Sequence, residues 1–364
     1  MSNVNDYPAA PETTSTNQGR PLSSEQLVTQ DPVFRLLHEK LGAPLTVILN
    51  VLLAGLVFVA DVLREAPAER PFEVLTSIRK LLIISFGLSV YFLLPRWIAD
   101  LFNGLKSNRV IAKARASYNS DDFQNDTARR IDKRICSVLG LTFVVVFWIH
   151  RMLTYSHKRP FWLEVVALVF VYALPYYAYL VSIIKFCLTL FSTKRLFDLF
   201  EVKISPLHVD GVGGFRPIGR MLLRYAVVLA IFVSLATVGR VLSYHDHSLH
   251  VTLNRSEVYM AGAACMLLPM FLWGWLWVPH KAMIEYRNDK LGKLAEELQN
   301  VDAEKEAELL AGRKKTYEIA KESYPTWPMS FHQVRYFLGL IMTPFIATIT
   351  TVLVQLLWAR LTKH

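Results

Sequence analysis

The chain has 364 residues, of which 53% are hydrophobic and only 19% are charged. Soluble domains usually carry about 25% charged residues, so the composition excludes an ordinary soluble domain and favours an integral membrane protein. The net charge of +10 does not indicate nucleic-acid binding, because the basic residues cluster between apolar runs and form no separate basic domain. They are better placed to orient membrane helices and to contact anionic lipid headgroups.

Residues 1–30 are rich in Ser, Thr, Asn, Pro and Gln and show no apolar periodicity. This composition predicts a disordered cytoplasmic tail. The tail lacks the basic and apolar regions of a cleaved signal peptide, so we expect the first membrane helix to direct insertion. A short amphipathic segment, Pro32–Lys40, precedes that helix.

Apolar runs follow one another to the end of the chain, and each approaches or exceeds the roughly 20 residues that cross a bilayer. The predicted spans are 43–63, 78–99, 136–155, 161–191, 219–243, 257–279 and 333–359. The sequence therefore predicts an all-α polytopic membrane protein with about seven transmembrane helices.

The distribution of Lys and Arg predicts the orientation. When each basic residue is assigned to the nearer end of its span, 29 of the 40 fall on one side and 11 on the other. Because cytoplasmic loops carry the excess, the N-terminus is predicted inside and the C-terminus outside a plasma or cytoplasmic membrane. The chain then divides into a six-helix bundle (31–279), a cytoplasmic helical segment (280–332) and a final transmembrane helix (333–364).

The cytoplasmic segment carries an apolar seam on an otherwise charged surface. Steps of seven, three, four and three residues connect the seam positions, as in a short coiled coil. Its members are Ile284, Leu291, Leu294, Leu298 and Val301. We expect this seam to pack on the protein's own helical extensions, with a separate protein as the alternative.

The stretch 204–220 has the highest density of Gly and Pro in the chain and joins two apolar spans. Three glycines in four residues permit backbone paths that other residues resist. This cytoplasmic loop could bind an anion through its amides, hold a metal through its His and Asp, or serve only as a tight joint. The candidate residues are His208, Asp210, Gly211, Gly213, Gly214 and Arg216.

A second polar loop, between the fifth and sixth spans, contains His245, His247 and His250. It could bind zinc or sense pH, or be an exposed polar turn. Charged residues such as Lys185 lie near span ends, where we expect them to extend to the headgroups. No nucleophile elbow, metalloprotease motif or metal-spaced cysteine set is present. We therefore predict no enzyme activity, no cofactor and no metal.

The last span carries a polar stripe on an apolar helix. Thr348, Thr351 and Gln355 recur at steps of three and four, so they share one helix face. The stripe could form hydrogen bonds to other helices of the bundle, or it could line a pore around a symmetry axis.

The spacing within this helix resembles the signature of insect gustatory and odorant receptors, which is Thr, Tyr, five apolar residues, Gln and Phe. Thr348, the five residues Thr350–Val354 and Gln355 match it, whereas Ile349 stands for the Tyr and Leu356 for the Phe. Those receptors also have seven helices, an inside N-terminus and an outside C-terminus.

The resemblance implies a homotetrameric cation channel with the last helix of each subunit lining the pore, a cytoplasmic anchor, and a small-molecule ligand bound in the outer half of the bundle. The leading hypothesis is thus an oligomeric, ligand-gated cation channel embedded in the lipid bilayer. The alternatives are a small-molecule transporter or lipid-handling enzyme with its site at the glycine loop, and a membrane-anchored signalling or defence component.

Overall fold

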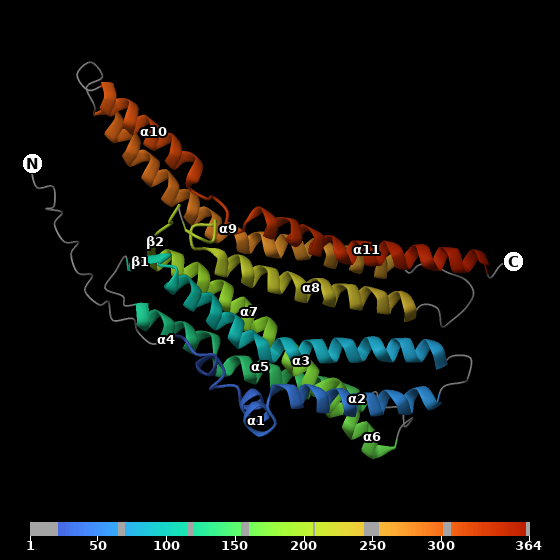
Figure 1. Cartoon of the computed structure of the whole chain (residues 1–364). Coiled ribbons are helices and arrows are strands. Elements are labelled where there is room, and N and C mark those ends of the chain that lie inside the picture. Colours follow the sequence, from blue (N-terminus) through green and yellow to red (C-terminus); the bar gives the residue numbers. More distant parts are fainter. Residues whose placement is uncertain are drawn as a thin grey trace, which may run out of the picture.

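The structure is a computed structural model that describes residues 21–64, 70–114, 120–153, 160–206, 208–243, 255–300 and 307–361. Long helices dominate this part of the chain (Figure 1). The short helical segments are η1 (Glu25–Leu27), α1 (Pro32–Lys40), α4 (Ser120–Ile131), α6 (Phe161–Val166) and the π-helical turn η2 (Ala167–Ala173). The long helices are α2 (Ala43–Arg64), α3 (Arg70–Ser107), α5 (Arg134–Leu153), α7 (Leu174–Leu199), α8 (Arg216–Ser243), α9 (Arg255–Gln299), α10 (Ala307–Ser323) and α11 (Phe331–Leu361).

The prediction of an all-helical fold is confirmed, and each apolar span expected from the sequence falls on helices, apart from residues 154 and 155 of the third span, which lie outside the described residues. Within the described residues, four helical stretches are long and apolar enough to cross a membrane: 43–64, 77–107, 161–199 and 216–235. This finding supports a membrane protein. The fourth expected span runs unbroken through α6, η2 and α7, and is longer than a single crossing requires.

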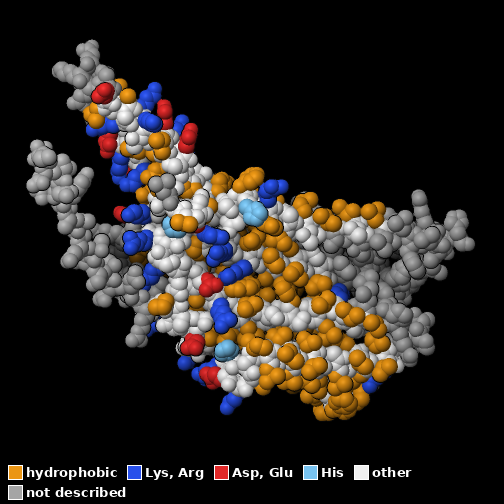
Figure 2. Space-filling view, in the orientation of Figure 1, with side chains coloured by type: hydrophobic (Ala, Val, Ile, Leu, Met, Phe, Trp, Pro, Cys, Tyr) orange, Lys and Arg blue, Asp and Glu red, His pale blue; other side chains and the backbone are white. Residues whose placement is uncertain are grey.

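The outer faces of several helices expose large apolar side chains in rows at helical spacing. On α2, for example, Leu52 is 65% exposed and Leu63 is 65% exposed. Soluble monomers rarely expose contiguous apolar patches of this extent, because water solvates them poorly. Figure 2 shows hydrophobic side chains gathered over the helical bundle, away from the projecting helices α9 and α10, as expected of a surface that contacts lipid.

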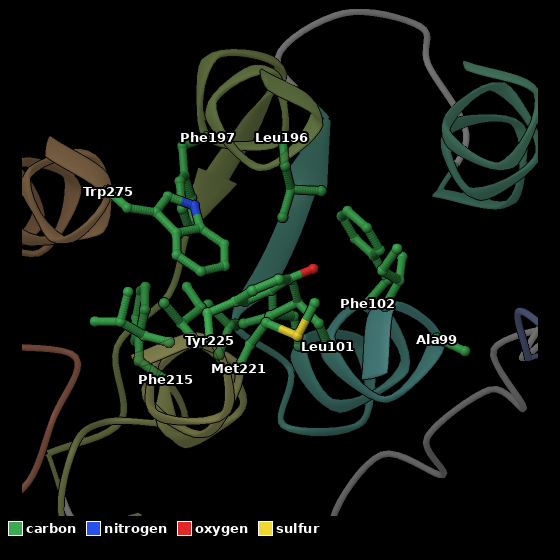
Figure 3. Close-up of a cluster of buried hydrophobic side chains, with 14 of the residues drawn as sticks. Ala99, Leu101, Phe102, Leu196, Phe197, Phe215, Met221, Tyr225 and Trp275 are labelled. Atoms are coloured by element: carbon green, nitrogen blue, oxygen red, sulfur yellow. The ribbon is translucent and has the colours of Figure 1, made fainter. Parts of the chain in front are cut away.

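Buried apolar side chains form two clusters. The larger connects α3, α7, α8 and α9, and Figure 3 shows Tyr225 at its centre, with Met221 and Trp275 around it. The smaller cluster connects α1, α2, α3 and α7 around Phe34, Tyr91 and Tyr177. The two clusters share α3 and α7, so these two helices are the spine of the bundle.

One antiparallel pair of short strands, β1 (Ile111–Ala114) and β2 (Phe200–Val202), was not predicted from the sequence. It follows directly after α3 and α7, and ties the ends of these two helices together. The amide of Lys203 also donates to the carbonyl of Val110 at 2.8 Å. The strands are three and four residues long, too short for a recognisable alternating pattern.

The C-terminal half of α9 and the whole of α10 project from the bundle as a helical hairpin (Figure 1), here called the arm. Seam residues Ile284, Leu291, Leu294 and Leu298 are half-buried where α10 packs along α9, whereas Val301 lies outside the described residues. Arg287 donates to the carbonyl of Lys321 at 2.7 Å. Within the described residues this segment is helical, and α10 packs along the part of α9 that carries the seam.

The direction of α9 changes where it leaves the bundle (Figure 1). Pro279 lies near the middle of α9, and a proline inside a helix removes one backbone hydrogen bond and favours a bend. The next residue, His280, stacks on Trp327 at 4.0 Å between ring centroids, and its Nδ1 lies 2.6 Å from the carbonyl oxygen of Thr326. The α10–α11 linker therefore braces the bend.

The predicted disordered tail, 1–30, is too long. Residues 1–20 lie outside the described part of the chain, but residues 21–30 are folded. Leu22 and Leu27 are buried, and Asn103 on α3 exchanges hydrogen bonds with both the amide and the carbonyl of Leu22, each at 2.8 Å. Tertiary contacts order a segment whose own composition is polar.

Phe123 tests the packing of α4 on the bundle. Its ring is 3% exposed and meets Phe200 edge-on at 5.3 Å. We expect Phe123→Ala to lower the free energy of unfolding by about 3–5 kcal/mol, because it leaves a cavity in the core. Thermal unfolding of the detergent-solubilised protein measures this effect. Phe331→Ala, at a ring that is 79% exposed, is the matched control and should change little.

Candidate functional site

A buried carboxylate, Asp31, lies at the start of α1 and is 1% exposed. Its Oδ1 accepts hydrogen bonds from the amide of Phe34 at 3.1 Å and from the hydroxyl of Tyr177 at 2.8 Å. Its Oδ2 accepts a hydrogen bond from the hydroxyl of Tyr91 at 2.8 Å. Asp31 thus caps α1 and joins that helix to α3 and α7.

Lys185, on α7, is the cation that faces Asp31. Its Nζ donates to the carbonyl of Leu27 at 3.1 Å, and it lies 3.5 Å from Oδ2 of Asp31 and 3.8 Å from Oδ1 of Asp132. The side chain is 3% exposed. The expectation that Lys185 extends to the lipid headgroups is therefore wrong. The reason is that two carboxylates inside the protein provide a closer partner than water.

Asp132 lies at the junction of α4 and α5 and is 3% exposed. Its Oδ2 accepts hydrogen bonds from the hydroxyl of Thr29 at 2.6 Å and from the amide of Gln30 at 2.7 Å. Burial raises the pKa of Asp132 above its ordinary value, although these hydrogen bonds and Lys185 act in the opposite direction. Asp31, Asp132 and Lys185, here called the charged cluster, join residues 27–31 to α7 and to the α4–α5 junction.

A polar cavity of about 590 Å³ lies beside the charged cluster, and Asp132 lines it. Three basic side chains also line it, one from the end of α4, one from the α4–α5 junction and one from the start of α5. The complete lining is Gln26, Thr29, Gln30, Asn125, Ala128, Arg129, Asp132, Lys133 and Arg134.

The glycine loop is built around the carboxylate of Asp210. Its Oδ1 accepts hydrogen bonds from the backbone amides of Val212 and Gly214, each at 3.0 Å, and its Oδ2 accepts one from the backbone amide of Arg216 at 3.2 Å. The ring of His208 lies 2.8 Å from Oδ1. The loop amides that the sequence offered to an anion thus bind the loop's own carboxylate in this structure.

Positive φ angles explain the glycines of this loop. Gly211, Gly213 and Gly214 have φ angles of 69°, 67° and 98°, in the region where a side chain is unfavourable. A Cβ atom on Gly214 would also lie 2.7 Å from Val110. Asn108, just after α3, donates to the carbonyl of Gly214 at 2.8 Å. This hydrogen bond fixes the loop to the end of α3.

Metal binding finds no further support among the described residues, where no group of three or more His, Cys, Asp or Glu side chains converges. The histidine-rich loop with His245, His247 and His250 lies outside the described part of the chain. The pore candidates Thr348, Thr351 and Gln355 lie within α11, but their side chains are outside the described residues as well.

Sequence reasoning missed the charged cluster, although two signals pointed to it. Asp31 followed by Pro32 is the usual start of a helix, with an acidic cap and a proline in the first turn. Lys185 lies within a long apolar run, where an ionisable residue is a functional candidate by default. Neither signal names the partner, because Asp31 and Asp132 are far from Lys185 in sequence.

Comparisons with known proteins contribute no assignment: no family model, no curated protein and no solved structure matches the chain.

Replacement of Lys185 tests the charged cluster. Lys185→Met should lower the free energy of unfolding by about 3–5 kcal/mol, because it leaves two carboxylates buried without their cation. The double variant, Lys185→Met with Asp31→Asn, should lose less unfolding free energy than the sum of the losses in the two single variants. A double-mutant cycle in thermal unfolding measures this difference. Lys194→Met, at an exposed position of the same helix, is the control. Strictly additive effects would contradict the proposed coupling.

The glycine loop predicts a pH effect. Partial burial tends to raise the pKa of Asp210, but the amides of Gly214, Val212 and Arg216 and the His208 ring together hold it below its ordinary value. A lowered pKa means that the carboxylate stabilises the fold above about pH 3.9, and that this contribution is lost as the pH falls through the folded pKa.

Asp210→Asn should therefore lower the free energy of unfolding by roughly 1–3 kcal/mol at pH 7. The difference from the unsubstituted protein should begin to shrink below about pH 3.9, where the carboxylate of the unfolded chain takes up its proton, and should be lost as the pH falls through the lowered folded pKa. Unfolding in denaturant at pH 7 and at a pH well below about 3.9 measures this difference. An equal difference at both would show that the charge of Asp210 does not hold the loop.

Proposed function

We propose that the protein is a multipass membrane protein that assembles into an oligomeric cation channel with α11 at the pore. The observation that carries this proposal is the one-sided packing of α11. This helix contacts α8 and α9, whereas its other side carries a row of apolar side chains that are more than half exposed. The row consists of Leu338, Met342, Ile346, Ile349 and Leu353, which are 55%, 51%, 59%, 58% and 53% exposed.

The arrangement of the helix ends supports a threaded membrane bundle. The C-terminal ends of α3 and α7 and the N-terminal ends of α8 and α11 lie at the end that carries the arm (Figure 1). The opposite ends of α8 and α11 point away from it. Basic side chains gather near the arm end (Figure 2), which we assign to the cytoplasm. The C-terminus then lies outside, as in the insect receptors that the sequence resembles.

Two faces of α11 are candidates for the pore. Positions 348, 351 and 355 each come two residues after the exposed positions 346, 349 and 353. Two residues correspond to about 200° around a helix, so the two sets of positions occupy opposite faces. The exposed row is therefore the face of α11 that is free to meet other subunits or lipid, and the threonine–glutamine face lies on the side of α8 and α9. We propose that permeating ions contact the threonine–glutamine face, which requires the pore to run between α11 and the rest of its own subunit. Hydrogen bonding within the bundle is the alternative role for this face.

The glycine loop supports a transporter or enzyme site less well, since Asp210 already occupies the amides that a ligand would need. We propose that the loop acts as a mechanical joint between α7 and α8. The arm, at the far end of α9, is the part of each subunit best placed to meet other copies or a cytoplasmic partner.

Cysteine accessibility tests the pore. In a protein whose native cysteines are replaced, single cysteines at positions 348, 351 and 355 should react with a charged thiol reagent and lose most of the current in a planar bilayer. Cysteines at 346, 349 and 353 are the matched set on the opposite face and should keep their current. Gln355→Leu should lower conductance, because it removes a polar group from the pore wall.

Each other outcome has a defined meaning. Block confined to positions 346, 349 and 353 would keep α11 at the pore but reject the threonine–glutamine face. A purified oligomer that conducts at no voltage would overturn the channel itself. A tag fused after His364 that reports from the cytosol would overturn the orientation and the pore assignment with it.

A further inference from the structure

The cavity beside the charged cluster is lined by basic side chains, two of which form no ion pair among the described residues. These two are Arg129 and Lys133, and both are exposed. Arg134 also lines it and donates from Nε to the side-chain oxygen of Gln30 at 2.7 Å, which orients its guanidinium group. Three cations around one cavity attract an anion with more than one negative charge.

The one acid in the cavity wall does little to oppose such an anion. Asp132 is 3% exposed, and its Oδ2 is engaged by Thr29 and Gln30. Its Oδ1 lies 3.8 Å from Nζ of Lys185, which offsets part of its charge and also lies 3.5 Å from Asp31. Three basic side chains still face one carboxylate in the lining. The wall of the cavity therefore carries a net positive charge.

The cavity lies where the apolar surface of α5 begins. Arg134 is the first residue of α5, and the exposed apolar side chains follow it at once. Ile135 is 56% exposed, Val138 is 56% exposed and Val146 is 59% exposed. On a membrane helix, this change from basic to apolar surface marks the level of the lipid headgroups.

We propose that this cavity holds the phosphate-bearing headgroup of an anionic membrane lipid, with the acyl chains along the exposed face of α5. The inference goes beyond the proposed channel, and it rests on α5 being a membrane helix rather than on conduction. Arg and Lys pair with phosphate oxygens through charge-assisted hydrogen bonds. The volume of about 590 Å³ lies within the range of about 300–1,000 Å³ that is usual for ligand pockets.

The number of cations sets the headgroup class. A zwitterionic phosphatidylcholine offers no net charge, and phosphatidylserine offers about one. A phosphomonoester adds close to two charges at neutral pH, which suits the three basic side chains better. We therefore expect phosphoinositides or phosphatidic acid to bind in preference to the other lipids.

Native mass spectrometry of the full-length protein in detergent tests this proposal, with phosphatidylinositol bisphosphate as the probe and phosphatidylcholine as the reference lipid. The probe should bind at least about tenfold more tightly than the reference. Arg129→Gln with Lys133→Gln should weaken probe binding about tenfold or more. Lys314→Gln with Lys315→Gln removes the same charge from exposed positions on α10 and should leave binding unchanged.

Three results would overturn the proposal. The two lipids could bind the unsubstituted protein equally, which would reject phosphate recognition. The two double variants could weaken probe binding equally, which would show that binding depends on the net charge of the protein and not on this cavity. Soluble inositol trisphosphate could bind as tightly as the lipid, which would assign the cavity to a free phosphate compound. None of these measurements uses conductance, so they test the lipid site independently of the proposed channel activity.

Discussion

The pairing of Lys185 with Asp31 and Asp132 is the interaction on which the arrangement of this protein depends. A lone ammonium group inside an apolar bundle would be too costly, and so would either carboxylate alone. Each charge therefore requires the others to be in place. Because the groups come from three separate stretches of chain, this requirement positions α1 and the α4–α5 junction against α7. Apolar packing alone is less directional and fixes such positions less strictly.

The same pairing explains why the segment before the first long helix is folded. Residues 27–31 supply a carbonyl, a hydroxyl, an amide and a carboxylate to the charged cluster. The tyrosines of α3 and α7 complete the hydrogen bonds of Asp31. The polar cavity lies between the same segment and the α4–α5 junction, since residues from both line it. Asp132 belongs both to the charged cluster and to the lining of the cavity.

The sequence predicted the helices well and their contacts poorly. Long apolar runs predicted each long helix of the bundle, because crossing or burying a helix requires that composition throughout its length. The half-buried seam at Leu291 and Leu294 was also readable, since its period is local. Lys185 was misplaced because its partners are distant in sequence. Asp210 was recognised as important, but whether its carboxylate binds the loop or leaves the amides for a ligand depends on backbone torsions that the sequence does not specify.

The continuous α9 has a mechanical consequence. At about 1.5 Å per residue, its 45 residues form a rod of roughly 65–70 Å that runs from inside the bundle to the tip of the arm. The helix changes direction where it leaves the bundle (Figure 1), and His280, near its middle, stacks on Trp327 of the α10–α11 linker. The arm is thus connected to α11 in two ways, through the helix α9 and through the linker that carries Trp327. The linker leads directly into the helix that we place at the pore.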